Sequence, residues 1–284
     1  MLHDGFDLVW PLYRRHKFEG GLHAALARPF TRALFGTGLR QPITTELAFS
    51  RGVAQYLSDD RELHEDLSHA GGEALLAAHG VARGFLERGF KVGQAIVGSL
   101  PVGGPAGDVS DMVARIAGLL FDEARRNAAG WQRVRGATPV AIVGAPPCID
   151  CDPRPLDSER MFDAFAQGYR ELHRLWTAVL PPATLLALKR ASAQPAATFR
   201  LDPALWARVV FDFAVGHRTG AMERRQLLRS MTPLYLGWMA SWVNSVRDAQ
   251  ADEVEERGDE VCRAFEAEKP YFISRWRWPD RFAP

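Results

Sequence analysis

The chain is organised around the stretch Arg40-Gln41-Pro42-Ile43-Thr44-Thr45-Glu46-Leu47-Ala48-Phe49-Ser50. It follows a helical pattern, and its alternation predicts a strand over residues 41–49. The first part of this strand carries hydrogen-bonding side chains, namely Gln41, Thr44, Thr45 and Glu46. Burying an acid and two hydroxyls is costly unless each finds a partner. The stretch is therefore either a satisfied polar segment of the core or part of a binding site.

Composition limits the classes of protein to consider. The chain has 284 residues, 47% of them hydrophobic, which is enough for a full core in one or two domains. Its formal net charge is +1, from 35 basic and 34 acidic residues, so no overall field attracts nucleic acid or an anionic membrane. No apolar run long enough to span a bilayer and no signal peptide is found, so a cytoplasmic protein is expected.

The three cysteines do not form a disulfide framework. Cys148 and Cys151 have the spacing of one half of a zinc site, but no second pair accompanies them. The dense histidines and acids of residues 64–73 also lack a recognisable ligand spacing, because His64 and His69 fall on different faces of a helix. No metal site is expected in this chain.

The remaining pattern predicts a few strands followed by many helices. Strands are expected over residues 6–13 and 91–99, with a brief strand-like run at 139–143. Helices are expected over 110–134, 156–180, from 202 onward, 227–246 and 251–268, the last ending before Pro270. Another helical pattern over residues 20–35 is expected to break near Pro29. The predicted fold class is α+β and mostly helical.

A basic cluster, Arg14-Arg15-His16-Lys17, follows the first strand. Such runs are usually solvated turns. The alternative is a contact to phosphate or carboxylate, because loops at strand ends along one edge of an open α/β sheet gather ligands.

Several stretches together resemble the later half of the catalytic domain of GT-A-fold glycosyltransferases. The similar group contains mannosylglycerate synthase and glucosyl-3-phosphoglycerate synthase, in which a strand reads Gln-Pro-(Leu/Ile)-Gly-Gly-Glu-(Leu/Phe). Here it reads Gln41-Pro42-Ile43-Thr44-Thr45-Glu46-Leu47, and the resemblance extends over residues 7–18, 29–36, 89–95 and 205–214. It implies a partial, acceptor-side GT-A-like α/β segment over residues 1–135 and a helical C-terminal domain over 136–284.

The resemblance also implies roles for the residues singled out above. Glu46 becomes the candidate catalytic residue, and Gln41, Thr44 and Thr45 line the acceptor side. Arg14, Arg15 and Lys17 become candidates for binding substrate through phosphate or carboxylate. The substrates implied are a nucleotide diphosphate sugar and a small hydroxy-acid or glycan acceptor.

The chain also departs from the family pattern. The helix containing His79-Gly80-Val81-Ala82 lacks the acceptor aspartate, and residues 100–108 lack the metal-binding histidine that relatives place there. The nucleotide-binding half with its Asp-x-Asp motif is expected to precede the strand at Asp7 and is not in this sequence. No cofactor is therefore expected in this chain, and Mg²⁺ or Mn²⁺ only where a complete donor site forms.

Two hypotheses follow. In the first, the chain belongs to a glycosyltransferase that is incomplete for catalysis alone, and another segment or chain supplies the donor half. In the second, it is a non-catalytic interaction or assembly module, with a partner chain or a second copy covering the open edge of its sheet.

Overall fold

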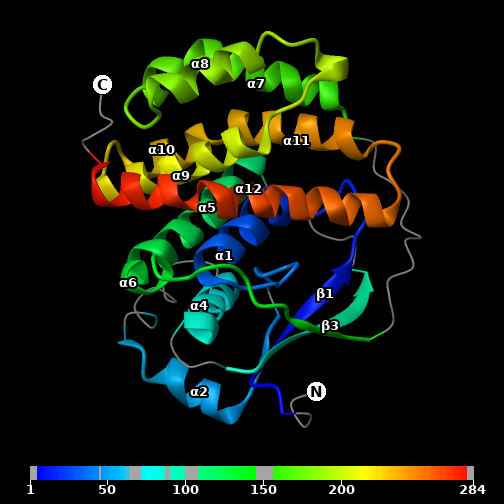
Figure 1. Ribbon diagram of the computed structural model, residues 1–284, viewed down its shortest axis with the longest axis vertical. Coiled ribbons are helices and arrows are strands. Elements are labelled where there is room, and N and C mark those ends of the chain that lie inside the picture. The colour runs from blue at the N-terminus through cyan, green and yellow to red at the C-terminus, as the bar shows by residue number, and fades with distance from the viewer. Residues whose placement is uncertain are drawn as a thin grey trace.

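The computed structural model describes residues 5–44, 46–61, 63, 72–86, 90–99, 108–144 and 156–279. A small mixed sheet lies at one end of the molecule, and layers of helices are stacked over it (Figure 1). The prediction of an α+β, mostly helical fold is confirmed. Within the described part of the chain, no helix is both long and apolar enough to cross a bilayer.

The sheet has the strand order β2-β1-β3-β4. Its members are β1 (Leu8–Arg14), β2 (Ala48–Phe49), β3 (Val92–Ser99) and β4 (Ala141–Val143). β1, β3 and β4 run parallel, whereas β2 is antiparallel to β1. The carboxyl ends of the three parallel strands therefore share one edge, where open α/β sheets bind ligands.

The predicted strand over residues 41–49 is wrong for most of its length, because only Ala48 and Phe49 pair with β1. The residues before them bond to side chains instead of to a neighbouring strand. The amide of Arg40 donates to Gln94 Oε1 at 2.8 Å, and the indole of Trp10 donates to the carbonyl of Pro42 at 3.0 Å. Pro42 itself has no amide hydrogen for a ladder.

Helices form the rest of the described structure. In chain order they are η2 (His23–Ala27, a π-helix), α1 (Arg28–Phe35), α2 (Arg51–Ser58), α4 (Gly72–Leu86), α5 (Val109–Arg126), α6 (Ala128–Trp131), α7 (Ser158–Trp176), α8 (Pro182–Ala191), η3 (Ala196–Thr198, a 3₁₀-helix), α9 (Pro203–Thr219), α10 (Arg224–Ser230), α11 (Thr232–Val246) and α12 (Ala251–Arg277).

Two helix ends differ from their predictions. The helix expected over residues 110–134 ends at Arg126, because the Asn127 side chain turns back to the Glu123 carbonyl at 2.9 Å. α12, expected to end before Pro270, continues to Arg277. Burial of Phe272 and Trp276 in the core offsets the backbone hydrogen bond that proline cannot make.

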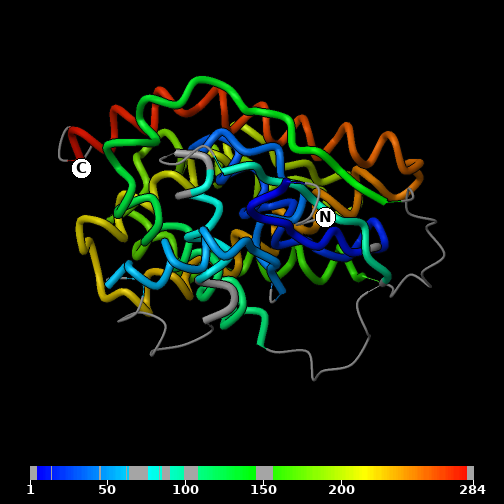
Figure 2. The backbone as a smooth tube through the Cα atoms, turned by 90° about the horizontal axis from the view of Figure 1, so that it is seen from below, coloured from blue at the N-terminus to red at the C-terminus, as the bar shows by residue number. Residues whose placement is uncertain are grey.

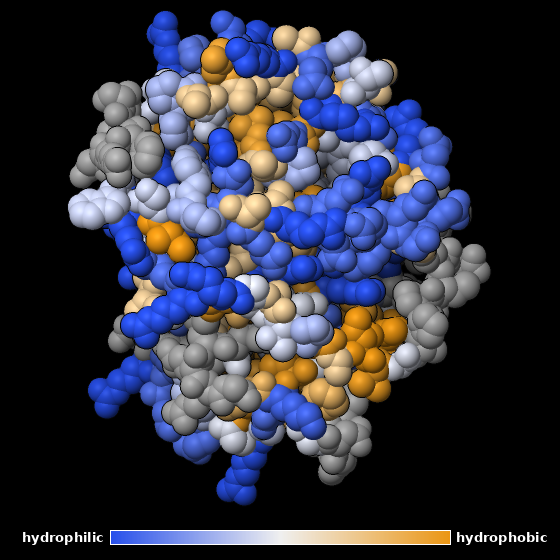
Figure 3. Space-filling view, in the orientation of Figure 1, coloured by the Kyte–Doolittle hydropathy of each residue, from blue (hydrophilic) through white to orange (hydrophobic). Residues whose placement is uncertain are grey.

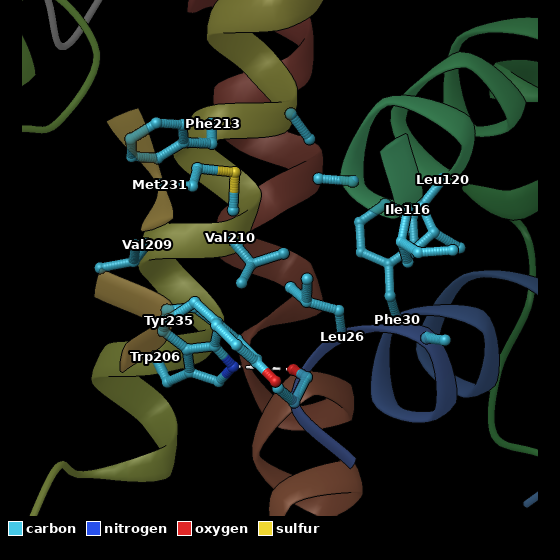
Figure 4. Packing of buried hydrophobic residues seen from close by; sticks show 14 of the residues in the cluster. Leu26, Phe30, Ile116, Leu120, Trp206, Val209, Val210, Phe213, Met231 and Tyr235 are labelled. Atoms are coloured by element: carbon cyan, nitrogen blue, oxygen red, sulfur yellow. Dashed lines mark hydrogen bonds between the residues drawn. The ribbon is translucent and has the colours of Figure 1, made fainter. Parts of the chain in front are cut away.

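The predicted break near Pro29 coincides with the change from π-helix to α-helix. Pro29 cannot donate to the carbonyl of Ala25, four residues earlier. The indole of Trp206 on α9 donates to that carbonyl instead, at 2.7 Å (Figure 4). The polar group left by the proline therefore binds the helical layer to the N-terminal part of the chain.

One hydrophobic core connects the two parts of the chain. Leu26 and Phe30 of the N-terminal part meet Ile116 and Leu120 of α5 and side chains of α9 and α11 (Figure 4). Seen from below, the N-terminal strand lies near the middle of the molecule and the C-terminal end of α12 at one side (Figure 2). The division at residue 135 stays a prediction; buried residues from both sides of it share this core, and β4 lies beyond it.

Candidate functional site

A cavity of about 750 Å³ lies at the carboxyl end of β1. In Figure 1 the arrow of β1 points toward the beginning of α12. Residues at the carboxyl end of β1 and residues in the first turns of α12 line the cavity. Its lining contains four cationic side chains, Arg15, Lys17, Arg28 and Arg40, and three carboxylates, Glu19, Asp252 and Glu255. The first turn of α12 contributes the positive end of a 27-residue helix to the same space.

Arg15 makes few contacts with other polar side chains of the described residues. Its Nε donates to Gln41 Oε1 at 3.4 Å, and its guanidinium lies 5.9 Å from the centre of the Tyr13 ring. Among the described residues, no carboxylate oxygen comes within 4.0 Å of its nitrogens. Burial lowers the pKa of Arg15, opposed by the charges of Glu19 and Tyr13. A partly buried cation with no carboxylate in contact favours an anionic ligand.

Gln41 holds this arrangement in place. Its side-chain amide donates to the Tyr13 carbonyl at 2.9 Å, and its oxygen accepts from the Tyr13 amide at 3.3 Å. The side chain thus imitates a neighbouring strand at the end of β1. Gln41 was expected to bind substrate, and it does line the cavity.

Lys17 is engaged with backbone. Its ammonium donates to the carbonyls of Arg247 at 2.7 Å and Ala249 at 3.1 Å, between α11 and α12. In return, the indole of Trp242 donates to the Lys17 carbonyl at 3.1 Å. These bonds fasten the helical layer to the end of β1. The substrate-binding role of Lys17 stays a prediction, and its observed contacts form the cavity wall.

Glu255 of α12 provides a carboxylate inside the cavity. Its Oε1 lies 2.6 Å from Arg28 Nη2 and 3.2 Å from Arg40 Nε. Arg28 also bonds Asp259 at 3.0 Å, which continues the ion pairs between α1 and α12. Glu255 thus occupies the position that an oxyanion ligand would take between these two arginines.

His23 contributes an imidazole to the cavity wall from the first residue of η2. Its Nδ1 is enclosed by protein and has no hydrogen-bond partner. Burial, with a further contribution from the charge of Arg15, lowers the pKa of His23 to about 3. The imidazole is therefore neutral at physiological pH.

Glu46 lies beside the cavity and reaches it through Tyr13. The Tyr13 hydroxyl donates to Glu46 Oε2 at 2.6 Å, and the Glu46 amide donates to Thr44 Oγ1 at 3.1 Å. Burial, followed by the hydrogen bond and charge of Glu46, raises the pKa of Tyr13. Glu46 is exposed and Thr44 is buried, so the carboxylate is the accessible member of this group.

Two of the expected site residues, Arg14 and Thr45, lie wholly or partly outside the described residues. Arg14 is the last residue of β1, but its side chain lies outside the described part of the chain, and so does Thr45. The helix that lacks the acceptor aspartate is described: Ala82 is fully buried, and His79 Nε2 lies 3.1 Å from Asp60 Oδ2. Neither residue lines the cavity.

The sequence pattern did not single out His23, Arg28, Arg40 or Glu255 as site residues. The local signal available is that Arg40 opens the organising stretch and Arg28 begins the helix before it. Among the described residues, no group of three or more histidines, cysteines, aspartates or glutamates is arranged to hold a metal ion.

No protein-family model matches this chain, and no curated protein is significantly similar to it.

Proposed function

We propose that the cavity is the acceptor side of a glycosyltransferase and binds a small hydroxy acid, with or without a phosphate group. The observation that carries this proposal is a cavity at the carboxyl end of a parallel strand, in which Arg15 has no carboxylate partner among the described residues. The resemblance of the sequence to acceptor-side segments of GT-A enzymes supports the same assignment. An enzyme of this kind would work in the cytoplasm.

In this proposal the side chains have separate roles. Arg15 binds the carboxylate or phosphate of the acceptor. Arg40 binds the same group when the acceptor displaces the Glu255 carboxylate from Arg40. Glu46, next to Tyr13, accepts the proton of the acceptor hydroxyl as its oxygen forms a bond to the anomeric carbon. The bond from that carbon to the nucleotide diphosphate breaks in the same reaction. A divalent cation would accompany the donor, with ligands that another segment or chain supplies.

Calorimetric titration tests acceptor binding. The probes are D-glycerate, 3-phosphoglycerate and, as an uncharged comparison, glycerol. The wild-type chain should bind both anions, and Arg15→Met should weaken their binding by about 10- to 100-fold, the loss expected for one charged hydrogen-bonding group. Arg160→Met on the exposed face of α7 is the matched control. Equal binding of glycerol and the anions would contradict the proposal.

Product formation tests the transfer step. The chain is incubated with UDP- or GDP-sugars, Mn²⁺ and the bound acceptor, and glycoside is detected by mass spectrometry. A Glu46→Gln variant that keeps acceptor affinity and loses product supports the general-base role. If acceptor binds and no sugar nucleotide yields product, the chain requires a separate donor half or is not a transferase.

The alternative proposal is a non-catalytic assembly module, and β4 is the observation that favours it. Each residue of this edge strand is exposed, including Ile142 and Val143 at 39% and 37%. Figure 3 shows hydrophobic side chains at the surface over this part of the molecule. An exposed strand edge favours pairing with another chain. Light scattering of wild type and Ile142→Lys would detect such an assembly and its loss.

A further inference from the structure

We infer that His23 contacts the ligand of the cavity and donates its Nε2 hydrogen to an oxyanion that Arg15 holds. This inference rests on the cavity of the proposed function being a ligand site, and it does not depend on sugar transfer. It concerns a residue that neither the sequence pattern nor the resemblance singled out. Four observations support it.

The first observation is the local backbone. His23 begins a π-helix, in which the Arg28 amide bonds the His23 carbonyl five residues earlier. π-helical turns are rare and are frequently found at functional sites. Here the turn is braced from behind, because a Cβ on Gly21 would overlap Met239 Sδ and the Tyr235 hydroxyl. Close packing against α11 thus fixes where the π-turn begins and directs His23 to the cavity.

The second observation is the hydrogen bonding of the ring. Nδ1 is buried and has no hydrogen-bond partner. Nε2 is not among the buried atoms, and it makes no hydrogen bond to a described residue. His23 is half-buried and lines the cavity, so Nε2 is the ring nitrogen open to it. A buried N–H without an acceptor is rarer than a buried lone pair without a donor. The stable tautomer therefore keeps Nδ1 bare and carries the proton on Nε2.

The third observation is the charge around the ring. Arg15 faces the same cavity, and its positive charge adds to burial in keeping His23 neutral, with a pKa of about 3. A neutral imidazole with a hydrogen on Nε2 can donate to an oxyanion without the cost of burying a second cation. Arg15 supplies the charge and His23 supplies a directed hydrogen bond.

The fourth observation is the state of the other cavity cations. Lys17 is bonded to two backbone carbonyls, and Arg28 is bonded to Glu255 and Asp259. Arg15 and His23 thus keep nitrogen donors that no carboxylate or carbonyl of the described residues engages. An oxyanion between them would satisfy both, which suits a phosphate or carboxylate with one oxygen for each donor.

Nitrogen NMR on the wild-type chain tests this directly. Imidazole ¹⁵N–¹H correlation spectra are recorded during titration with inorganic phosphate and with 3-phosphoglycerate, and His23→Gln identifies the His23 signals. We expect a neutral ring with the proton on Nε2 before addition, and a shift of Nε2 that saturates with the calorimetric affinity. His173, on the exposed side of α7, should not shift.

Two substitutions separate a ligand contact from a structural role. His23→Leu should weaken binding of 3-phosphoglycerate by about tenfold, the effect of one lost hydrogen bond to a charged group. His23→Gln places an amide hydrogen near the position of Nε2–H and should bind within about threefold of wild type. With D-glycerate, whose carboxylate stays ionised from pH 5 to 8, the effect of His23→Leu should be the same at every pH in that range, because the ring does not titrate there.

Each outcome is decisive. Anions that bind without moving the His23 signals, anions that do not bind, or equal losses in both variants would overturn the inference. Should His23→Leu fail to fold, the wild-type spectra still decide. Anion binding with the His23 signature but no sugar transfer would refute the proposed function and keep the inference. Transfer that is unaffected in His23→Leu would do the reverse.

Discussion

Replacement of Glu255 by glutamine should raise the affinity of the cavity for anions and lower the stability of the fold. Glu255 is the carboxylate that faces Arg28 and Arg40 inside the cavity, and an oxyanion ligand competes with it for Arg40. Glutamine keeps the size of the side chain and removes its charge. Tighter anion binding together with a less stable fold is the result expected if the Glu255 carboxylate competes with the ligand for Arg40.

The size of the effect follows from the geometry. Opposite charges 3.2 Å apart, as for Arg40 and Glu255, attract by about 1.3 kcal/mol in water. Both side chains are over a third exposed, so measured values for comparable pairs, up to about 1 kcal/mol, are the better guide. Releasing Arg40 should therefore tighten anion binding by about fivefold. Loss of the pairs to Arg28 and Arg40 should reduce the free energy of unfolding by about 1–2 kcal/mol.

Calorimetry with 3-phosphoglycerate and urea denaturation measure the two quantities. The matched control is Glu256→Gln, because Glu256 pairs with Arg263 on the exposed face of the same helix, away from the cavity. It should leave the anion affinity unchanged. Weaker anion binding in Glu255→Gln would refute the reasoning, since it would mean that Glu255 helps to hold the ligand.

Three further predictions concern stability. Asp212→Leu should reduce the free energy of unfolding by about 3–5 kcal/mol in urea denaturation, because it leaves the buried Arg275, 2.8 Å away, without its carboxylate; Asp212→Leu combined with Arg275→Met should recover much of this loss, and simple additivity would contradict the pairing. Lys269→Met should cost about 2–4 kcal/mol by the same measurement, because the buried ammonium donates to the carbonyls of Ala33 at 2.6 Å and Val134 at 3.0 Å; a loss below about 1 kcal/mol would show that water replaces it. His23 has a pKa of about 3 when folded and about 6.5 when unfolded, so the unfolded chain binds more protons between these values and stability falls as pH drops below 6.5. His23→Gln should therefore lessen acid destabilisation at pH 4 by about 1–3 kcal/mol relative to wild type, and parallel stability–pH curves would exclude it.

Much of the fold could be predicted from local pattern. The strands expected around residues 6–13 and 91–99 appear as β1 and β3. For β1 the apolar run from Leu8 to Leu12 suits a strand covered on both faces, and all five residues are buried. The predicted starts of α7 and α9 agree with the structure to within two residues, since Asp157 and Asp202 accept hydrogen bonds from the first turns as N-caps. These signals act over a few residues and are therefore visible in the sequence.

The failures have physical causes that lie far away in the chain. The stretch from Arg40 onward alternates like a strand, but the Gln94 side chain bonds to the amide of Arg40 and the Trp10 indole to the carbonyl of Pro42. Pro270 is a helix-ending signal that burial of Phe272 overrides. In each case a long-range contact outweighs a local preference that is worth a few kcal/mol at most.

Local pattern likewise predicts one part of the candidate site, and long-range contacts determine the other part. The sequence by itself determined the cations that follow β1, the polar stretch beside them and a mostly helical fold, because residue type and spacing fix strand ends and helix faces. Only the tertiary structure decided that the first turns of α12 close a cavity over Arg15, that Glu255 meets Arg28 from 227 positions away, and that a π-turn aims His23 inward. Local periodicity states which face of an element is buried. Close packing of the whole core determines which distant element covers that face, so a short stretch of the sequence cannot predict it.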